Sequence, residues 1–426
     1  MKSFNLLAIL FLITMMISGC GEKDDNLIQL SGQFSAGQDT IVFDTIAVKL
    51  NATSVDSINL TGTWRIISGD QLYSGFSDIH DPEAVFTGIY RDIYILEWSV
   101  TEGGTMLSDS VSVRFIASIP SGLTAGDLYV VYDTNYVVLN GSPLKEGLLG
   151  NWSAISENSN DIEFSDSSLA NSICTGKPMN SYMIRWTVSN GLEEHYADAK
   201  FIIGDMFTDL RDNKNYKKVK IGDQIWMAED LKADIYADGS SLTLLPDNTC
   251  LYESNLYDEF YFKKHEYQDF SGNTYPIEEE GYYYTWAAVM NNALSTDDSP
   301  SNVQGICPDG WHVPSSAEWY ELFNYVTEDY ASGNEGLALR SNYAWNEDMD
   351  IGTNYYGFWA LAKGYHYSDM YGQIGTVSNF WSTFQTDYET WGEYYDAYFF
   401  NISWNYAQVT TSRKIEGRCV RCLQNN

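Results

Sequence analysis

Six cysteines and five histidines are the side chains in this 426-residue chain best suited to covalent or metal chemistry. The histidines are scattered, at positions 80, 195, 265, 312 and 366, and none has a partner in the spacing of a metal site. The sequence also lacks a serine nucleophile motif and a glycine-rich phosphate loop. We therefore predict no catalytic residue and no metal ligand. We expect His312 to be structural, hydrogen-bonded to the backbone beside Pro314.

Cys20 stands between an apolar segment and an acidic one. Residues 6–17 form an apolar run after a short basic start, which suits the core of a signal peptide and is too short to span a bilayer. The ending Ile17-Ser18-Gly19-Cys20 resembles the lipobox of bacterial lipoprotein precursors. That resemblance implies removal of residues 1–19 and attachment of acyl chains to Cys20, which would anchor the chain in outer-membrane lipid. An ordinary signal peptide with a chance cysteine is the alternative.

The acidic segment behind this cysteine points to the cell surface. Residues 20–29 begin with Cys-Gly-Glu-Lys-Asp-Asp and are expected to form a tether. They resemble the surface-export signal of Bacteroidetes lipoproteins, which implies a lipid-anchored, surface-exposed position on the outer membrane.

The charge balance restricts the partners. The chain has 58 acidic residues against 24 Lys and Arg, a formal net charge of −34. It should repel nucleic acid and anionic lipid headgroups, so we predict no nucleic-acid partner. Neutral sugars and calcium remain compatible. Aromatic residues make up 15% of the chain, which favours strands and large cores.

An internal repeat with an offset of 88 residues occupies the first half of the chain. Trp64 and Trp98 recur as Trp152 and Trp186, and the residues around them alternate between apolar and polar types. Each copy therefore predicts a β-sandwich of about seven strands with buried tryptophans.

Both copies resemble the PKD-like domains of Bacteroidetes lipoproteins, which have an immunoglobulin-like fold. The resemblance gives a first sandwich at 30–117 and a second at 118–204, and it implies spacing and presentation rather than catalysis. Cys174 takes the place that Phe86 has in the first copy, so we expect a buried thiol in the core.

Six sequence blocks mark a different domain from about residue 205. In order, they resemble the Fibrobacter succinogenes major paralogous domain over 205–426. The family implies an α+β, C-type-lectin-like fold, for which no catalytic residues are established. The blocks are "LRDNKNYKKVKIGDQIWMAEDLK" (210–232), "GYYYTWAAVMNNA" (281–293), "CPDGWHVPSSAEWYELFNYV" (307–326), "YYGFWALAKGYHY" (355–367), "NFWSTFQ" (379–385) and the final "GRCVRCLQNN".

The residues predict local structure in this domain without the family. Helical spacing appears in "TWAAVMNNAL" and again in "SSAEWYELFNYV", where Ser315 and Glu318 form a capping-box pattern. A strand should turn at Gly222-Asp223, and two more should flank Asn405. The chain as a whole is therefore predicted to be multidomain, with two all-β immunoglobulin-like sandwiches followed by an α+β C-type-lectin-like domain.

The family resemblance implies a disulfide between Cys307 and Cys422. This sequence departs from the family by adding Cys419 and by keeping Cys250 without its usual partner, which is replaced by an insertion at 252–280. The resemblance therefore suggests Cys250–Cys419 as a second bridge, with Cys174 unpaired. Competing pairings are Cys307–Cys419 and Cys250–Cys422. A Cys419–Cys422 bond is disfavoured if both lie on a strand, because they would point to opposite faces.

These features predict a non-catalytic surface protein that binds an extracellular glycan or protein through its C-terminal domain. The alternatives are a subunit of a surface assembly, such as a fimbrial tip or uptake complex, or an oxidase of the sulfatase-activating type with Cys419 and Cys422 as reactive thiols. No lectin calcium signature is present, no cofactor is expected, and the acidic run 347–350 could hold at most a structural calcium. The candidate ligand-stacking rings are Trp345, Trp391, Tyr394, Tyr395 and Trp404, and the alternative is that most of them belong to the core.

Overall fold

The computed structural model describes residues 33–425 apart from 56–59, 103, 246–260, 265–266, 269–273, 276–280, 331, 347–349, 368–369 and 391–393. The lipobox, Cys20, the tether and Cys250 lie outside these residues. The chain divides into two compact units. The first holds the first sandwich with residues 145–149 and 189–194, and the second holds the rest of the second sandwich with the C-terminal domain.

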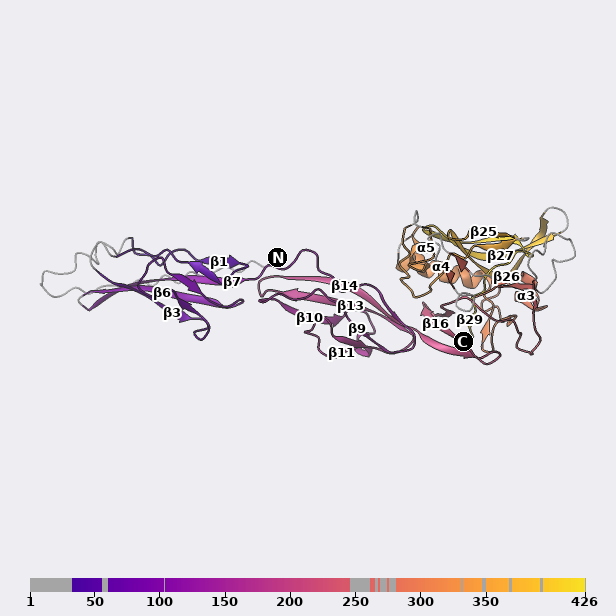
Figure 1. The fold of residues 1–426 in the computed structure, drawn as a ribbon, viewed down its shortest axis with the longest axis horizontal. Helices are drawn as coiled ribbons and strands as arrows, with labels where there is room; N and C mark the ends of the chain where they lie inside the picture. Colours follow the sequence, from indigo (N-terminus) through magenta and orange to yellow (C-terminus); the bar gives the residue numbers. More distant parts are fainter. Residues whose placement is uncertain are drawn as a thin grey trace. The chain divides into compact units, whose positions relative to one another are not determined.

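The first sandwich consists of two sheets with strand orders β1-β7-β6-β3 and β2-β5-β4 (Figure 1). Strand β1 runs parallel to β7, and the other pairs in both sheets are antiparallel. The strands are β1 (Thr40–Phe43), β2 (Ala47–Lys49), β3 (Gly62–Ser68), β4 (Gly75–Phe76), β5 (Val85–Thr87), β6 (Ile93–Glu102) and β7 (Thr105–Ile116).

The second sandwich repeats this topology strand for strand. Its sheets have the orders β10-β13-β14-β8 and β11-β12-β9, and β8 again runs parallel to the last strand, β14. The elements are β8 (Tyr129–Val131), β9 (Tyr136–Val138), β10 (Leu149–Ala154), the 3-10 turn η2 (Ser159–Asp161), β11 (Glu163–Phe164), β12 (Ile173–Thr175), β13 (Asn180–Ser189) and β14 (Glu194–Ile203). The predicted pair of all-β sandwiches is confirmed.

The repeated tryptophans explain why two divergent sequences reach one fold. Trp64 and Trp98 are buried with ring centroids 5.1 Å apart, and Trp152 and Trp186 are buried with centroids 4.9 Å apart. The indole N–H of Trp64 donates to the carbonyl of Asp81, and that of Trp152 donates to Leu169, 88 residues later. Each pair therefore fills the space between its two sheets while its polar atoms remain bonded.

Glycine makes room for one ring of each pair. A Cβ on Gly62 would lie 1.9 Å from the Trp98 ring, and one on Gly150 would lie 2.2 Å from the Trp186 ring. Cys174 is fully buried, as predicted, and is a free thiol. Burial raises its pKa to about 12, so it stays protonated and unreactive.

The C-terminal domain is α+β, as predicted. Its larger sheets have the orders β15-β16-β17-β29-β23 and β26-β27-β28, and the smaller ones are β18-β19-β22, β20-β21 and β24-β25. The strands of the first are β15 (Asp205–Asp209), β16 (Lys214–Ile221), β17 (Gln224–Met227), β23 (Trp311–His312) and β29 (Leu423–Gln424). Those of the second are β26 (Val377–Thr390), β27 (Tyr394–Ser403) and β28 (Tyr406–Arg413). The small sheets use β18 (Thr243–Leu244), β19 (Tyr261–Lys263), β20 (Tyr267–Gln268), β21 (Thr274–Tyr275), β22 (Tyr283–Tyr284), β24 (Tyr365–Tyr367) and β25 (Met370–Gly372).

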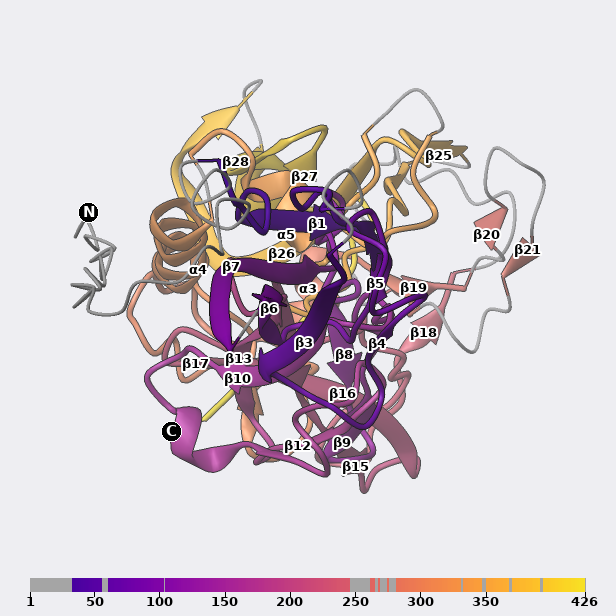
Figure 2. The same cartoon turned by 90° about the vertical axis from the view of Figure 1, so that its left-hand side faces the viewer.

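The described residues of this domain include the helices α3 (Trp286–Met290), α4 (Ser316–Asp329) and α5 (Glu335–Leu339). Helix α4 begins at the predicted capping box of Ser315 and Glu318. It packs through Trp319 and Leu322 against the β26-β27-β28 sheet, beside which it lies in Figures 1 and 2. The predicted helix at 285–294 is shorter, because Asn291 takes a left-handed conformation that ends it.

Side chains of the second sandwich are built into the core of the second compact unit. The Tyr132 hydroxyl donates to the carbonyl of Gly357 at 2.7 Å. The ammonium of Lys200 lies 3.7 Å from the ring centroid of Tyr355, and burial lowers the Lys200 pKa to about 8. Ile202 belongs to the same apolar cluster as helix α4. Experiments on the C-terminal domain should therefore use the whole chain.

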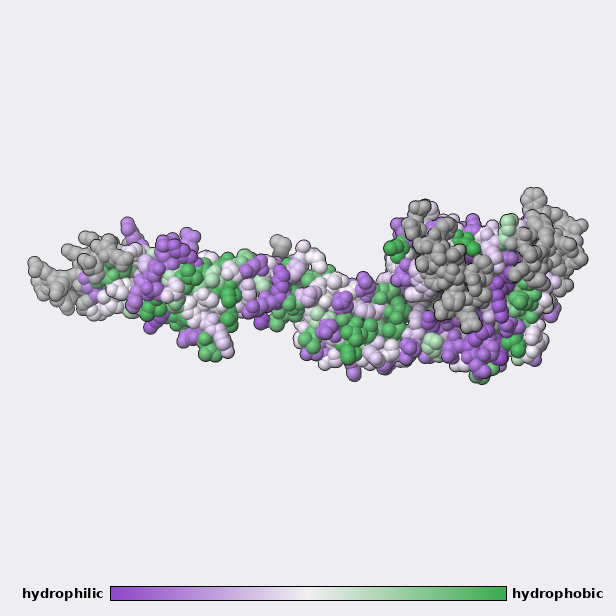
Figure 3. Space-filling view, viewed as in Figure 1, coloured by the Kyte–Doolittle hydropathy of each residue, from purple (hydrophilic) through white to green (hydrophobic). Residues whose placement is uncertain are grey.

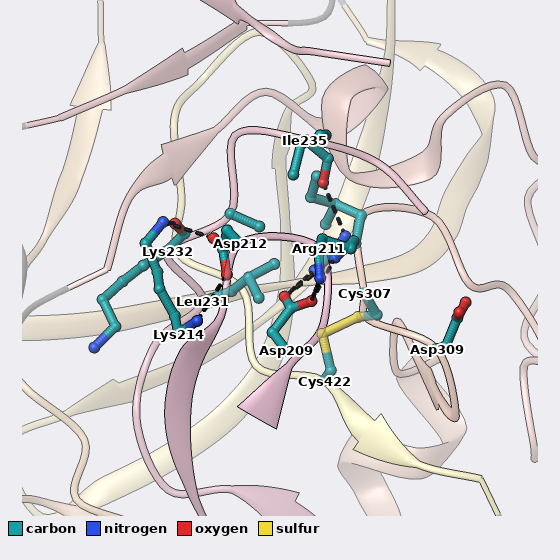
Figure 4. Close-up of polar contacts among 12 residues, drawn as sticks. Asp209, Arg211, Asp212, Lys214, Leu231, Lys232, Ile235, Cys307, Asp309 and Cys422 are labelled. Carbon is teal, nitrogen blue, oxygen red and sulfur yellow. Dashed lines mark hydrogen bonds and ion pairs between the residues drawn. A yellow bond between two sulfur atoms is a disulfide. The ribbon is translucent and has the colours of Figure 1, made fainter. Parts of the chain in front are cut away.

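The predicted Cys307–Cys422 disulfide is present. Figure 4 shows the disulfide beside the buried ion pair of Arg211 with Asp209. The Arg211 guanidinium also donates to the carbonyls of Ile235 and Ile306. The loop that precedes β23 is therefore fixed at two consecutive residues. Arg211 binds the carbonyl of Ile306, and the disulfide holds Cys307.

The suggested Cys250–Cys419 bridge is wrong. Cys419 is a free thiol, buried in the apolar cluster that also contains Trp319. Its backbone pairs with Asn379 and Trp381 of β26, which fixes it inside the domain. Cys419, which this sequence adds to the family pattern, is therefore a core residue and does not replace the missing disulfide partner of Cys250.

Candidate ligand-binding surface

Exposed apolar side chains alone do not locate a site in this protein. On the face drawn in Figure 3, apolar residues reach the surface in small patches separated by polar ones. Such scattered exposure is ordinary for a folded protein. A site needs a further observation, and the turn between β27 and β28 provides one.

Trp404 occupies that turn in an unfavourable backbone conformation. Ser403 pairs with Tyr406, so Trp404 and Asn405 form a two-residue hairpin turn. Trp404 has a φ of +48°, a region that favours glycine and asparagine and costs other residues on the order of 1–3 kcal/mol. Its side chain is nevertheless 53% exposed, so core packing does not account for its choice.

Buried groups of the domain hold this turn through hydrogen bonds to its backbone. Arg340 is fully buried, and its guanidinium donates one hydrogen bond to the carbonyl of Trp404 and another to the carbonyl of Asp350. The amide of Gly336 in α5 donates to the carbonyl of Asn405 at 2.9 Å. A Cβ on Gly336 would lie 2.8 Å from the backbone of the turn, so only glycine permits this approach.

Trp345 packs against the Arg340 guanidinium. The guanidinium carbon lies 4.2 Å from the centroid of the Trp345 ring, whose indole N–H donates to the carbonyl of Ala360. Burial lowers the pKa of Arg340 to about 10, well above neutral pH, so the side chain stays charged. Trp345 thus acts as a support for the turn and not as an exposed stacking ring.

Tyr406 and Gln408 extend the exposed surface along β28. They are two residues apart on one strand, so they point to the same face, and both are exposed. Gln408 pairs across the sheet with Asn401, whose amide donates to Asn379 at 2.8 Å. We call Trp404, Tyr406 and Gln408 the hairpin surface; it offers two aromatic rings and an amide but no charge.

The structure treats the five predicted stacking residues differently. It joins Trp345 and Trp404 through Arg340. Tyr394 and Tyr395 lie in β27, but the structure does not describe their side chains. Trp391 lies outside the described residues. Tyr406 and Gln408 were missed, although the alternation of β28 two residues after Trp404 was a usable signal. Arg340 gave no such signal, because its partners are remote in sequence.

A small pocket lies at the start of α4, and His312 is one of the residues that line it. Its volume is about 90 Å³, and Asp223, Glu318 and Glu321 are among the residues that line it. The His312 ring contacts Glu318 at 2.8 Å and Asn425 at 2.6 Å. The expected backbone partner is therefore wrong, because both ring nitrogens meet side chains.

The protonation of His312 reflects these partners. Burial works against its positive charge, but the hydrogen bond and charge of Glu318 outweigh it, so the His312 pKa lies above its usual 6.5. Among the described residues, no three His, Cys, Asp or Glu side chains are placed to hold a metal ion. The pair completes the cap of α4 and is structural.

The thiols do not form a reactive pair. Cys422 is bonded to Cys307, and burial raises the pKa of the Cys419 thiol well above its usual value. The free pair that an oxidase of the sulfatase-activating type would need at these positions is not formed.

A comparison with protein-family models finds a match in the C-terminal domain. Residues 219–424 match the model of the Fibrobacter succinogenes major domain. This part of the chain is therefore similar to that family. Its assignment to the C-type-lectin-like fold stays a prediction of the resemblance. No curated protein matches the chain.

Solved structures resemble the sandwiches only distantly. Domains 3–5 of Drosophila OTK are 9% identical over 39% of this chain and 59% of that one, with a TM-score of 0.22. The PKD domain of human KIAA0319 is 21% identical over 22% of this chain and 86% of that one, with a TM-score of 0.18. The insect immune protein hemolin is 9% identical over 38% and 44%, with a TM-score of 0.24. Values this low carry no conclusion about function.

Proposed function

We propose that this chain is a non-catalytic, lipid-anchored surface protein whose C-terminal domain binds an extracellular glycan at the hairpin surface. One observation carries the proposal. The domain holds Trp404 in a costly backbone conformation, braces it with a buried arginine, and leaves its ring exposed. Strain that the surrounding structure maintains without a packing reason is typical of functional positions.

The chemistry of the hairpin surface favours a neutral sugar. Aromatic rings pack on the apolar faces of sugars, and an amide can both donate to and accept from hydroxyl groups. The surface residues carry no charge, while the chain as a whole carries −34. An uncharged ligand avoids the repulsion that an anionic glycan would meet.

Anchoring rests on the sequence around Cys20. No helix in the described part of the chain is both long and apolar enough to cross a membrane. We propose attachment to the outer membrane through acyl chains on Cys20, because the ending Ile17-Ser18-Gly19-Cys20 resembles a lipobox. Cells fed a labelled fatty acid should label the wild-type chain and not Cys20→Ser. Equal labelling of both, or none of either, would refute the anchor.

Truncation of the central ring tests the binding function. The unlipidated full chain is applied to a glycan array, and hits are measured in solution with wild type, Trp404→Ala and Tyr406→Ala. We expect each variant to lose about tenfold or more in affinity, as central aromatic residues do at binding sites. Tyr73→Ala, which removes an exposed ring from the first sandwich, is the matched control and should bind normally.

The outcomes separate the alternatives. Unchanged glycan affinity in Trp404→Ala would contradict the assignment of the surface. Silence across the array would overturn the glycan proposal and turn attention to a protein partner, as in a surface assembly.

A further inference from the structure

A sealed cluster of charged groups lies away from the hairpin surface and has no part in the proposed function. Asp230 follows β17, and Lys363 precedes β24. The Lys363 ammonium nitrogen is 4.0 Å from Oδ2 of Asp230, and each side chain is only 1% exposed. An ion pair on the surface is far more exposed than this one. Lys264 and Asp234 are 3.3 Å apart, and their side chains are 34% and 40% exposed.

The two oxygens of Asp230 are in different environments. Oδ1 accepts a hydrogen bond from Nε of Arg421 at 2.9 Å. Oδ2 is buried and has no hydrogen-bond partner. A buried carboxylate oxygen that accepts no hydrogen bond is costly even with an ammonium 4.0 Å away, so this carboxylate gains by losing Oδ2.

The surroundings hold the reacting groups and exclude water. The Lys363 ammonium donates to the carbonyl of Gly281 at 2.9 Å and lies over the ring of Tyr283. Gly281 has a φ of +78°, and a Cβ on it would lie 2.4 Å from Cβ of Asp230, so the backbone closes tightly on the carboxylate. Buried Cys419 belongs to the adjoining apolar cluster.

We propose that Lys363 and Asp230 condense to form an intramolecular amide bond. A bond forms between Nζ of Lys363 and Cγ of Asp230, and the bond from Cγ to Oδ2 breaks. The ammonium first gives one proton to the carboxylate, and the neutral amine then has the lone pair that adds to Cγ. That proton and one further amine proton leave with Oδ2 as water, and the last proton remains on the amide nitrogen. The ion pair thus supplies every atom and proton of the reaction, and no oxidant or cofactor is required.

Arg421 is placed to assist this step. As Nζ adds to Cγ, negative charge develops on Oδ1, which already accepts the Nε–H of Arg421. A preorganised donor at such an oxygen stabilises the tetrahedral intermediate. Arg421 is itself fixed by bonds to the carbonyls of Phe358 and Trp359. Holding the partners in place replaces a bimolecular encounter, and the burial of both side chains disfavours the reverse hydrolysis.

The intact mass of the full chain tests the proposal. After reduction and denaturation, the wild-type chain should be lighter than its sequence by one water, and tandem mass spectrometry should find a branched peptide joining Asp230 to Lys363. Lys363→Arg should show the full sequence mass. Lys264→Arg, which alters the exposed pair, is the matched control and should keep the loss.

Asp230→Asn keeps the shape of the site and changes the leaving group. Attack on the amide expels ammonia in place of water, so this variant should be lighter than its sequence by one ammonia. This result would test the amide bond even if Lys363→Arg fails to fold. A wild-type mass equal to the sequence would overturn the proposal. So would a water loss mapped to Asp238 or Asp309, because each precedes a glycine and can close to a succinimide.

Discussion

Replacing Cys307 and Cys422 together by serine is expected to destabilise the C-terminal domain by about 4–5 kcal/mol. The bridge closes a segment of 115 residues, and a cross-link over so long a loop removes much conformational freedom from the unfolded chain. That segment contains α4, α5 and the whole β26-β27-β28 sheet. The bridge also joins the loop before β23 to the residue before β29, and β23 and β29 pair with each other.

Urea denaturation of the full chain, followed by tryptophan fluorescence, measures this effect. A multidomain chain can unfold in several steps, so the relevant step is the one that reductant shifts in the wild type. Wild type in reductant should reach the midpoint of the double serine variant, which itself should not respond to reductant. A wild-type midpoint unaffected by reductant would contradict the prediction.

Trp319→Ala is expected to cost about 3–5 kcal/mol, the range for removing a buried tryptophan. Trp319 is fully buried in α4, with ring centroids 4.4 Å from Trp226, 4.7 Å from Phe400 and 5.8 Å from Phe380. Its indole N–H also donates to the carbonyl of Trp381. Because these rings belong to different elements, none can fill the cavity without moving a strand or helix.

Trp404→Ala is the natural comparison for this variant. It removes the same side chain from the same domain, but from an exposed turn, and should change the stability by no more than about 0.5 kcal/mol. The two variants therefore separate core from surface tryptophan in one urea experiment. Similar losses in both, or a Trp319→Ala chain as stable as wild type, would show that the ring cluster does not hold the domain together.

Local sequence patterns were sufficient for much of the fold. The capping box at Ser315, the turn at Gly222-Asp223 and the strands around Asn405 are all observed where the residues predict them. Each depends on neighbours within a few residues, where side-chain type and spacing dictate the backbone. Errors arose where partners were remote, as with Cys419 and with the contact of His312 to Asn425, 113 residues away.

The sequence by itself determined the two repeated sandwiches, the α+β domain and the Cys307–Cys422 bridge, because alternation, periodicity and family motifs are written along the chain. Tertiary structure alone decided that Arg340 braces Trp404, 64 residues away, and that Asp230, Lys363 and Arg421 share one sealed site. Such contacts depend on how separate elements pack, and a local sequence pattern does not predict which buried charged side chains will lie next to each other.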